Sequence, residues 1–178
     1  QLLMLLFTAI LLCSCQSNYQ ALFNGKSLEG WRQLEFAENK PYGQGNWKVV
    51  NGAIEGEQIS TARRQGSLLA TEKEFGDFEL TVDFKHDWGC DSGVFLRANK
   101  QGDGFQISID HLEGGVIGFV HGQGIGNFNT TPFGFRNSDK EVENFYDAVK
   151  RDKLTYACTA EDFTRSFKRG EWNTLKIR

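Results

Sequence analysis

The sequence predicts an all-β domain, built as an antiparallel sandwich, and three observations support this prediction. Apolar and polar residues alternate over several short segments, and a period of two is the spacing of strands with one buried face. Gly-rich turns separate these segments. The 178 residues include 15 Phe and 20 Gly but only 2 Pro, a composition that favours strands joined by tight turns. The sequence lacks the regular alternation of strands and helices that builds a βαβ fold.

Length and charge narrow the possible classes of protein. The chain is long enough for one domain with a substantial core and too short for two. Its formal net charge is −3, and acidic and basic residues are mixed along it. Because nucleic-acid binding needs a basic face, we expect no nucleic-acid partner.

The first residues predict a targeting segment. Leu2–Leu12 is apolar, has the length of a secretory signal core, and is too short to cross a bilayer as a helix. Leu12 stands three residues before Cys15, which resembles a bacterial lipobox. We therefore expect residues 1–14 to be a lipoprotein signal, Cys15 to be lipidated, and residues 15–20 to be a linker. The protein would then be exported and lipid-anchored in the bacterial cell envelope, in the periplasm or at the cell surface.

The domain begins near residue 21 and opens with several strand signals. Residues 21–31 predict a short strand, an Asn-Gly turn and an aromatic anchor at Trp31, and residues 46–56 predict a hairpin turning at Asn51-Gly52. Residues 66–87 predict two strands, of which the second alternates clearly. Its inner face would hold Phe78, Leu80, Val82 and Phe84, and its outer face Glu79, Thr81, Asp83 and Lys85.

Three further segments predict strands with polar residues on one face. In Ser92–Arg97, Val94 and Leu96 alternate with Phe95 and Arg97. In the next segment, Phe105, Ile107 and Ile109 would point inward, and Gln106, Ser108 and Asp110 outward. In the third, Val116 and Val120 would share one face, and Ile117, Phe119 and His121 the other. We expect His121 to lie on the polar face with Gln106.

The last quarter of the chain predicts a helical insertion over residues 138–169. Apolar residues recur there at helical spacing from Val142 to Val149. Ser138 with Glu141 forms one candidate capping box, and Thr159 with Asp162 a second. The final residues, GEWNTLKIR, read as the start of a strand, so we expect further strands beyond the C-terminal end. At the other end, no basic residue precedes Leu2, so we also expect the natural chain to start before Gln1.

Several familiar motifs do not fit. The segment HGQGIGNFN lacks the glycine spacing of a phosphate-binding loop and reads as a mobile loop. The single-strand carboxylate motif of β-sandwich glucanases, Glu-x-Asp-x-x-Glu, does not occur, which disfavours ordinary retaining hydrolysis. The histidines have neither helical spacing nor Cys neighbours. Asp83 and Asp110 with His111 and His121, beside Arg97, could still hold a divalent metal ion.

The polar face allows two interpretations. Arg97 and Asp110 could form a cross-strand ion pair, which contributes only about 0.2–1 kcal/mol and needs no function. Alternatively, Phe95, Gln106 and Ser108, with Trp88 nearby, could form a sugar-binding surface. Aromatic rings stack on the C–H patches of sugars, and amides and charged groups bind their hydroxyls.

Six motifs occur in a fixed order that resembles one known family. They are LFNGKSLEGW, WKVVNGAIEG, LLATEKEFGDFELTVDFK, DSGVFLR, GFQISID and GEWNTLKIR. Together they are similar to the 3-keto-disaccharide hydrolase family over residues 21–178, apart from the insertion. The resemblance implies a concanavalin A-like jelly roll, common in secreted bacterial lipoproteins, and a chain incomplete at its C-terminal end.

The resemblance also implies a reaction. A ketone at C3 of a sugar acidifies the proton on C2, so a base can remove it and the enolate can expel the substituent at C1. Water then adds, which completes a net hydrolysis. For these roles the catalytic candidates are Asp110 or His111 as base, Arg97 as the group that stabilises the enolate, and His121 as acid or metal ligand. The substrate-binding candidates are Lys85, Trp88, Phe95, Gln106 and Ser108.

Three functions remain open at this point. The first is a hydrolase or lyase acting on 3-keto-glycosides. The second is a non-catalytic, lectin-like lipoprotein module that binds carbohydrate. The third is a structural lipoprotein whose polar strand face contacts only solvent. An enzyme needs a base on the polar face, whereas a binding module needs only aromatic and amide groups.

Overall fold

The computed structural model describes residues 19–34, 45–58, 66–86, 90–110, 117–126, 130, 134–136, 141–143 and 159–178. Every strand pairing within these ranges is antiparallel, which confirms the predicted all-β class. The strands are β1 (Trp31–Gln33), β2 (Gly45–Val50), β3 (Ala53–Gln58), β4 (Leu69–Thr71), β5 (Leu80–Phe84), β6 (Asp91–Leu96), β7 (Gly104–Asp110), β8 (Ile117–Gln123), β9 (Gly134–Arg136), β10 (Glu141–Glu143) and β11 (Asn173–Ile177). The described ranges contain one helix, α3 (Ala160–Ser166).

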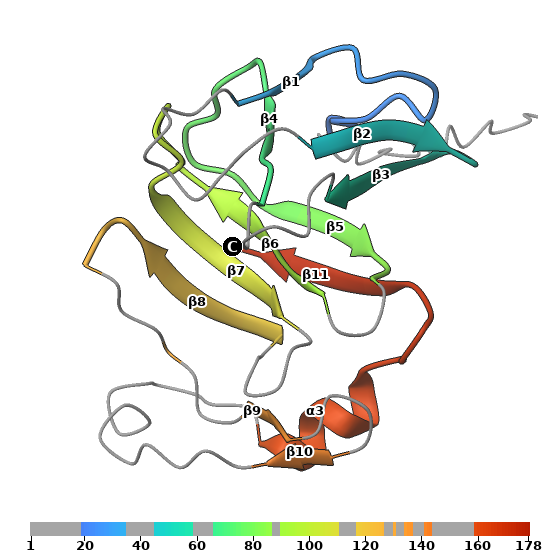
Figure 1. Cartoon of the computed structure of the whole chain (residues 1–178), viewed down its shortest axis with the longest axis vertical. Helices are drawn as coiled ribbons and strands as arrows, with labels where there is room; N and C mark the ends of the chain where they lie inside the picture. Colours follow the sequence, from blue (N-terminus) through green and yellow to red (C-terminus); the bar gives the residue numbers. More distant parts are fainter. Residues whose placement is uncertain are drawn as a thin grey trace, which may run out of the picture.

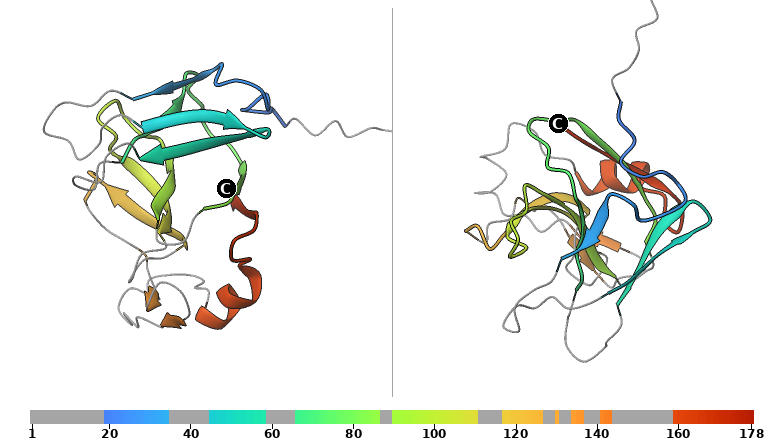
Figure 2. Two further views of the ribbon diagram at one scale, coloured as in Figure 1. Left: turned by 45° about the vertical axis from the view of Figure 1, so that its right-hand side comes forward. Right: turned by 90° about the horizontal axis from the view of Figure 1, so that it is seen from above.

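The strands form five ladders: β1–β4, β2–β3, β5–β11, β9–β10 and the three-stranded sheet β6–β7–β8. Figure 1 shows the three-stranded sheet on one side of the molecule, with the β5–β11 pair and the β2–β3 hairpin on the other. In Figure 1 and the left view of Figure 2, α3 and the β9–β10 pair lie together at the end far from β1. Helix α3 contacts β10 there.

The predicted hairpin is confirmed in β2 and β3. Val50 pairs with Ala53, so the turn contains only Asn51 and Gly52. Both residues have positive φ, 50° and 79°, as a type I′ turn requires. Asn and Gly are the residues that adopt this conformation at least cost, so the two-residue signal fixes the register of the hairpin.

The short strand predicted before Trp31 does not form. Instead, the side-chain oxygen of Asn24 accepts hydrogen bonds from the backbone of Lys26 and Ser27, each at 2.8 Å. This local turn competes with strand pairing, because it satisfies backbone groups that a ladder would otherwise use. The predicted anchor does hold the segment, since Trp31 donates its Nε1–H to the Leu22 carbonyl at 2.8 Å.

Strands β5 and β11 confirm the predicted alternation and the predicted final strand. Leu80, Val82 and Phe84 are half-buried, whereas Thr81 and Asp83 are exposed. Strand β11 pairs with β5 along its whole length. On the exposed face, Thr174 donates its hydroxyl to Asp83 at 2.6 Å.

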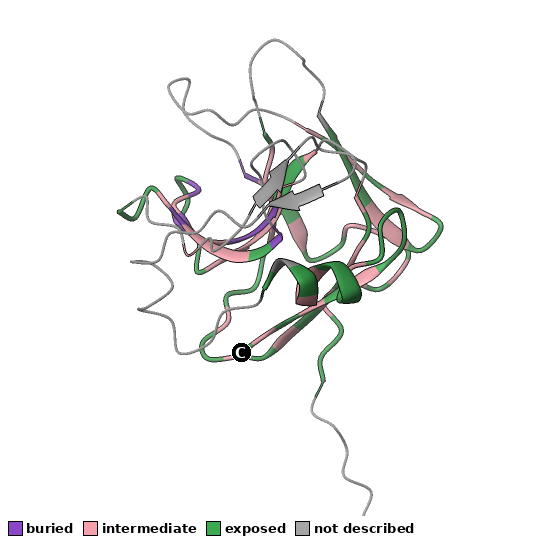
Figure 3. Cartoon of the chain, turned by 90° about the horizontal axis from the view of Figure 1, so that it is seen from below, coloured by how far each residue is buried: buried purple, intermediate pink, exposed green. Residues whose placement is uncertain are grey.

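Three of the four buried apolar residues in the described part of the chain belong to the three-stranded sheet, and the fourth is Leu34. Figure 3 shows the buried segments in purple. Ile107, Ile109 and Ile117 expose only 8%, 5% and 5% of their surface. Phe105 was predicted to join them but is 39% exposed. It pairs with Gly122 and follows the β6–β7 turn, so it lies at the end of the sheet, where fewer neighbours can cover it.

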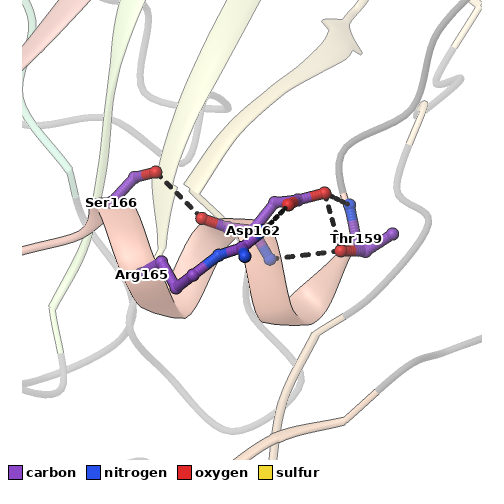
Figure 4. A network of polar contacts seen from close by, with 4 residues as sticks. All are labelled: Thr159, Asp162, Arg165 and Ser166. Carbon is purple, nitrogen blue, oxygen red and sulfur yellow. Dashed lines mark hydrogen bonds and ion pairs between the residues drawn. The ribbon is translucent and has the colours of Figure 1, made fainter.

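The predicted helical insertion over residues 138–169 is contradicted at residues 141–143 and confirmed at residues 160–166. Residues 141–143 form strand β10 and pair with β9, so no helix begins at the Ser138–Glu141 box. Cross-strand pairing overrides the helical spacing at these residues. The second capping box is confirmed: Thr159 and Asp162 cap α3 reciprocally (Figure 4). Residues 144–158 lie outside the described residues.

The predicted signal segment and Cys15 also lie outside the described residues, so lipidation stays a prediction. Within the described part of the chain, no helix has the length and apolar character needed to cross a membrane.

Candidate active site

The polar face of the β6–β7–β8 sheet consists of three rows of paired residues. In one row, Phe95 lies opposite Gln106, which lies opposite His121. In the next row, Gly93 lies opposite Ser108, and in the third, Asp91 lies opposite Asp110. Directly opposed residues of antiparallel strands project from the same face. The structure therefore brings Phe95, Gln106, Ser108, Asp110 and His121 onto one face, as the sequence predicted.

A β-bulge in β8 places His121 on this face. Ile107 pairs with Val120 and Ile109 pairs with Ile117, so β8 has one residue more than β7 between the two pairs. Gly118, with φ of 84°, lies in this irregular segment. The extra residue reverses the alternation, which explains why Ile117 is buried with Ile109 although it was predicted to share a face with His121.

Gln106 lies across Gly93 rather than pointing straight out from the sheet. A Cβ atom on Gly93 would come within 2.6 Å of Gln106 Nε2 and 2.7 Å of its Cγ. The same Nε2 donates a hydrogen bond to the Ser92 carbonyl at 3.3 Å. The amide thus leans toward the end of the face that carries Asp91 and Asp110, and it retains a second N–H for a ligand.

Ser108 differs from the sequence prediction in its exposure. It was expected to face solvent, but only 9% of its surface is exposed. Its neighbours across the sheet are Gly93 on β6 and the bulged segment of β8. A serine hydroxyl can both donate and accept a hydrogen bond. The middle of the polar face is therefore sheltered, and it has a donor and acceptor to offer.

Arg97 does not join Asp110, which rules out both the predicted ion pair and a shared site with Asp110. Leu96 pairs with Phe105, so Arg97 stands at the far end of the hairpin, about 20 Å from Asp110 by strand rise. It leaves the strand with φ of 52°. Its guanidinium contacts Asp77 at 2.9 Å and the Gly76 carbonyl at 3.3 Å.

Among the remaining candidates, those that the structure describes lie on another ladder. Lys85 is exposed and follows β5, which belongs to the separate β5–β11 ladder. His111 and Trp88 lie outside the described residues. Among the residues that the structure does describe, no group of three or more His, Cys, Asp or Glu side chains could hold a metal ion. Asp83 likewise lies on β5, outside the three-stranded sheet that carries Asp110 and His121.

Asp91 is a polar-face residue that sequence reasoning missed. It opens the DSGVFLR motif, but the predicted strand began at Ser92 and therefore assigned Asp91 to neither face. The register with β7 places it directly across from Asp110, two positions from Gly93. The only signal in the sequence was its even spacing from Phe95, because residues 91, 93 and 95 share a face in any regular strand.

The face combines groups suited to carbohydrate chemistry. A carboxylate can remove or deliver a proton, an amide and a hydroxyl can bind sugar hydroxyls, and an aromatic ring can stack on a sugar. His121 lies four residues along the sheet from Asp110, about 13 Å away by strand rise. The two side chains therefore suit different parts of a ligand and not two adjacent atoms.

Comparison with known proteins identifies the family. No curated protein sequence matches this chain significantly. A family profile described as a 3-keto-alpha-glucoside-1,2-lyase-like domain matches residues 18–178. This match confirms the family predicted from the six motifs, and its concanavalin A-like fold agrees with the antiparallel ladders. The chain therefore belongs to the family of 3-keto-alpha-glucoside-1,2-lyase-like domains.

Proposed function

We propose that this protein cleaves 3-keto-glycosides by removing the proton on C2 and eliminating the substituent on C1. Membership of a carbohydrate-active family supports the substrate class. The observation that carries the proposal is the polar face itself: Asp110 stands beside the sheltered Ser108 and the leaning amide of Gln106. A base next to groups that bind hydroxyls is what the reaction needs.

The chemistry follows from the ketone. The C3 carbonyl accepts the electron pair that the C2–H bond releases, so an enolate forms when a base takes the proton. Collapse of the enolate breaks the C1–O bond and leaves an unsaturated 3-keto sugar and an alcohol. Addition of water to the double bond then gives hydrolysis. The site must therefore hold the sugar, remove one proton and stabilise one oxyanion.

We assign the base to Asp110, with the neighbouring His111 as the alternative that the sequence offers. Stabilisation of the enolate was predicted for Arg97. That residue instead forms an ion pair with Asp77, and it lies about 20 Å from Asp110 by strand rise. Gln106 takes this role in our proposal, because its Nε2 has an N–H beyond the one given to Ser92. Phe95 and Ser108 would contact the sugar ring, and His121 would contact a more distant part of the substrate.

The proposal is tested with the purified protein and a 3-keto-glucoside, compared with the same glucoside left unoxidised. Turnover is expected only for the oxidised sugar, since only its C2 proton is acidic. Asp110→Asn should lower kcat by about 100-fold or more, the usual effect of losing a general base. Glu79→Gln, which removes one carboxylate from an exposed position before β5, is the matched control and should keep full activity.

A lectin-like binding module is the second candidate, because Phe95, Gln106 and Ser108 could bind a sugar without a base. Saturable glycan binding without turnover of any 3-keto-glycoside would favour it. Loss of turnover in Glu79→Gln to the same degree as in Asp110→Asn would contradict the assignment of the base.

A further inference from the structure

Asp91 and Asp110 form a pair of carboxyl groups across β6 and β7. Directly opposed residues in an antiparallel pair have Cβ atoms about 5 Å apart, and both side chains project from the polar face. Asp91 is exposed and Asp110 is half-buried, so a ligand on the face can reach both. Strands β6, β7 and β8 contain neither Lys nor Arg, so the sheet itself supplies no basic side chain other than His121.

The elimination needs a second proton transfer that Asp110 cannot perform alone. While Asp110 takes the proton from C2, the oxygen that leaves C1 must receive one. C1 and C2 are adjacent atoms, so the acid has to stand within a few ångströms of the base. His121, about 13 Å along the sheet from Asp110, does not meet this condition, whereas Asp91 does.

We propose, resting on the function proposed above, that Asp91 is a further catalytic residue, the acid that protonates the oxygen leaving C1. A sugar ring that enters with its C1–C2 edge toward the pair has one carboxyl group on each side of its plane. One side presents the C2–H bond, and the other presents the C1–O bond. Two carboxyl groups also flank the glycosidic bond in retaining glycosidases, where their roles differ.

The protons and electrons of the step balance within the pair. In the proposed starting state the two carboxyl groups share one proton, with Asp110 as the carboxylate and Asp91 as the carboxylic acid. The C2 proton passes to Asp110, and the C2–H electron pair ends in the new C1–C2 double bond. The C1–O electron pair stays with the departing oxygen, which takes the proton of Asp91. The two carboxyl groups therefore hold one proton both before and after the elimination. Transfer of that proton from Asp110 to Asp91 restores the starting state.

Two neighbouring side chains point to a ligand at this pair. Ser108, next to Asp110 on the same face, is nine-tenths buried and carries a hydroxyl that can donate and accept a hydrogen bond. Gln106 is drawn over Gly93 toward the same end of the face. Both groups can therefore bind the hydroxyls of a sugar whose C1–C2 edge meets the carboxyl pair.

The test is the dependence of the rate on the leaving group. An acid matters greatly for a poor leaving group and little for a good one, so two 3-keto-glucosides are compared, the methyl and the para-nitrophenyl glycoside. Asp91→Asn should lower kcat/KM for the methyl glycoside by about 100-fold and for the para-nitrophenyl glycoside by less than about 10-fold. Asp91→Glu should recover part of the loss, and Glu79→Gln should change neither rate.

The outcomes separate this inference from the function on which it rests. An active wild-type protein in which Asp91→Asn slows both substrates equally, or neither, would overturn the role of Asp91 alone. A folded wild-type protein that converts neither substrate would overturn the proposed function and this inference with it. Because Asn has nearly the shape of Asp, an unchanged circular dichroism spectrum and unfolding midpoint would show that the variant is folded.

Discussion

His121 lies directly opposite Gln106, and this pairing depends on a single extra residue in β8. Without the bulge, strict alternation back from His121 would place Ile117 on the polar face and remove it from the core. The bulge thus serves two needs at once: it buries Ile117 against Ile109 and keeps His121 with the residues of the proposed site.

The bulge should be sensitive to substitution at Gly118. Its φ of 84° is unfavourable for any residue with a Cβ, although no atom lies within 4 Å of the position a Cβ would take. The cost of Gly118→Ala is therefore a backbone cost, about 1–2 kcal/mol in the free energy of unfolding. Gly76 is equally open but has no positive φ, so Gly76→Ala is the matched control. Equal urea midpoints for the two variants would contradict this account.

The same bulge marks the limit of what alternation can predict. The faces of β5, β6 and β7 followed from a period of two, because those strands are regular. In β8 the sequence gives no sign that one residue is unpaired. The alternation therefore predicted the correct face of the sheet for His121 and the wrong face for Ile117.

Register was the second feature that the sequence could not supply. The motif DSGVFLR and the motif GFQISID were both recognisable, but which residues face each other depends on the length of the turn between them. That turn places Leu96 level with Phe105 and Asp91 level with Asp110, so Arg97 lies at the opposite end of the hairpin from Asp110. The predicted Arg97–Asp110 pair was therefore wrong, and the Asp91–Asp110 pair was missed.

Gly93 should be essential for the position of Gln106. A Cβ there would meet Gln106 Nε2 at 2.6 Å and the Ile107 carbonyl oxygen at 2.8 Å. We expect Gly93→Ala to destabilise the protein by about 1–3 kcal/mol and to lower kcat/KM for a 3-keto-glucoside. Because the amide can swing away but the backbone cannot, Gln106→Ala should relieve only part of the stability loss. Measured in a double-mutant cycle, zero coupling between the two positions would contradict the observed contact.

Ser67 joins the β1–β4 and β2–β3 ladders through one oxygen. Trp47 Nε1 and Gln33 Nε2 both donate to its Oγ, at 2.8 and 2.9 Å. Ser67→Ala leaves two part-buried donors without this acceptor, so we expect a loss of about 1–3 kcal/mol in the free energy of unfolding. Thr71→Ala, which removes a hydroxyl bonded only to the exposed Lys73 carbonyl, is the control and should cost much less. Chemical unfolding followed by tryptophan fluorescence measures both.

Lipidation at Cys15 is a prediction from the sequence alone. If the natural precursor is processed at this residue, radiolabelled palmitate should be incorporated into the wild-type protein made in its bacterial host. Cys15→Ser should abolish the label, and Cys13→Ser, a cysteine two residues earlier, should keep it. Label retained in Cys15→Ser would contradict the predicted anchor and the envelope location with it.

The capping box of α3 should make part of the stability depend on pH. Hydrogen bonds from the Thr159 side chain, then from Arg165 and from the Thr159 backbone, hold the pKa of Asp162 below its usual value. A carboxyl whose pKa is lowered by folding stabilises the folded state above its unfolded pKa, about 3.9, and loses that contribution as the pH falls through the lower folded value. Thr159→Ala should cost about 1 kcal/mol at neutral pH, a usual value for an N-cap. The difference from wild type should shrink near pH 2, where the carboxylate is being protonated in both proteins.

The control for this prediction is Glu161→Gln, because Glu161 is an exposed first-turn acid outside the capping box. Asp162→Asn should reduce the loss of unfolding free energy at acid pH, whereas Glu161→Gln should leave most of that pH dependence in place.

The stacking of Phe163 on Phe167, and of Phe167 on His86 beside β5, connects the helix to the sheet. Fraying of the cap should therefore appear in urea unfolding of the whole domain, and a pH dependence that is unchanged in Asp162→Asn would show that the box does not stabilise it.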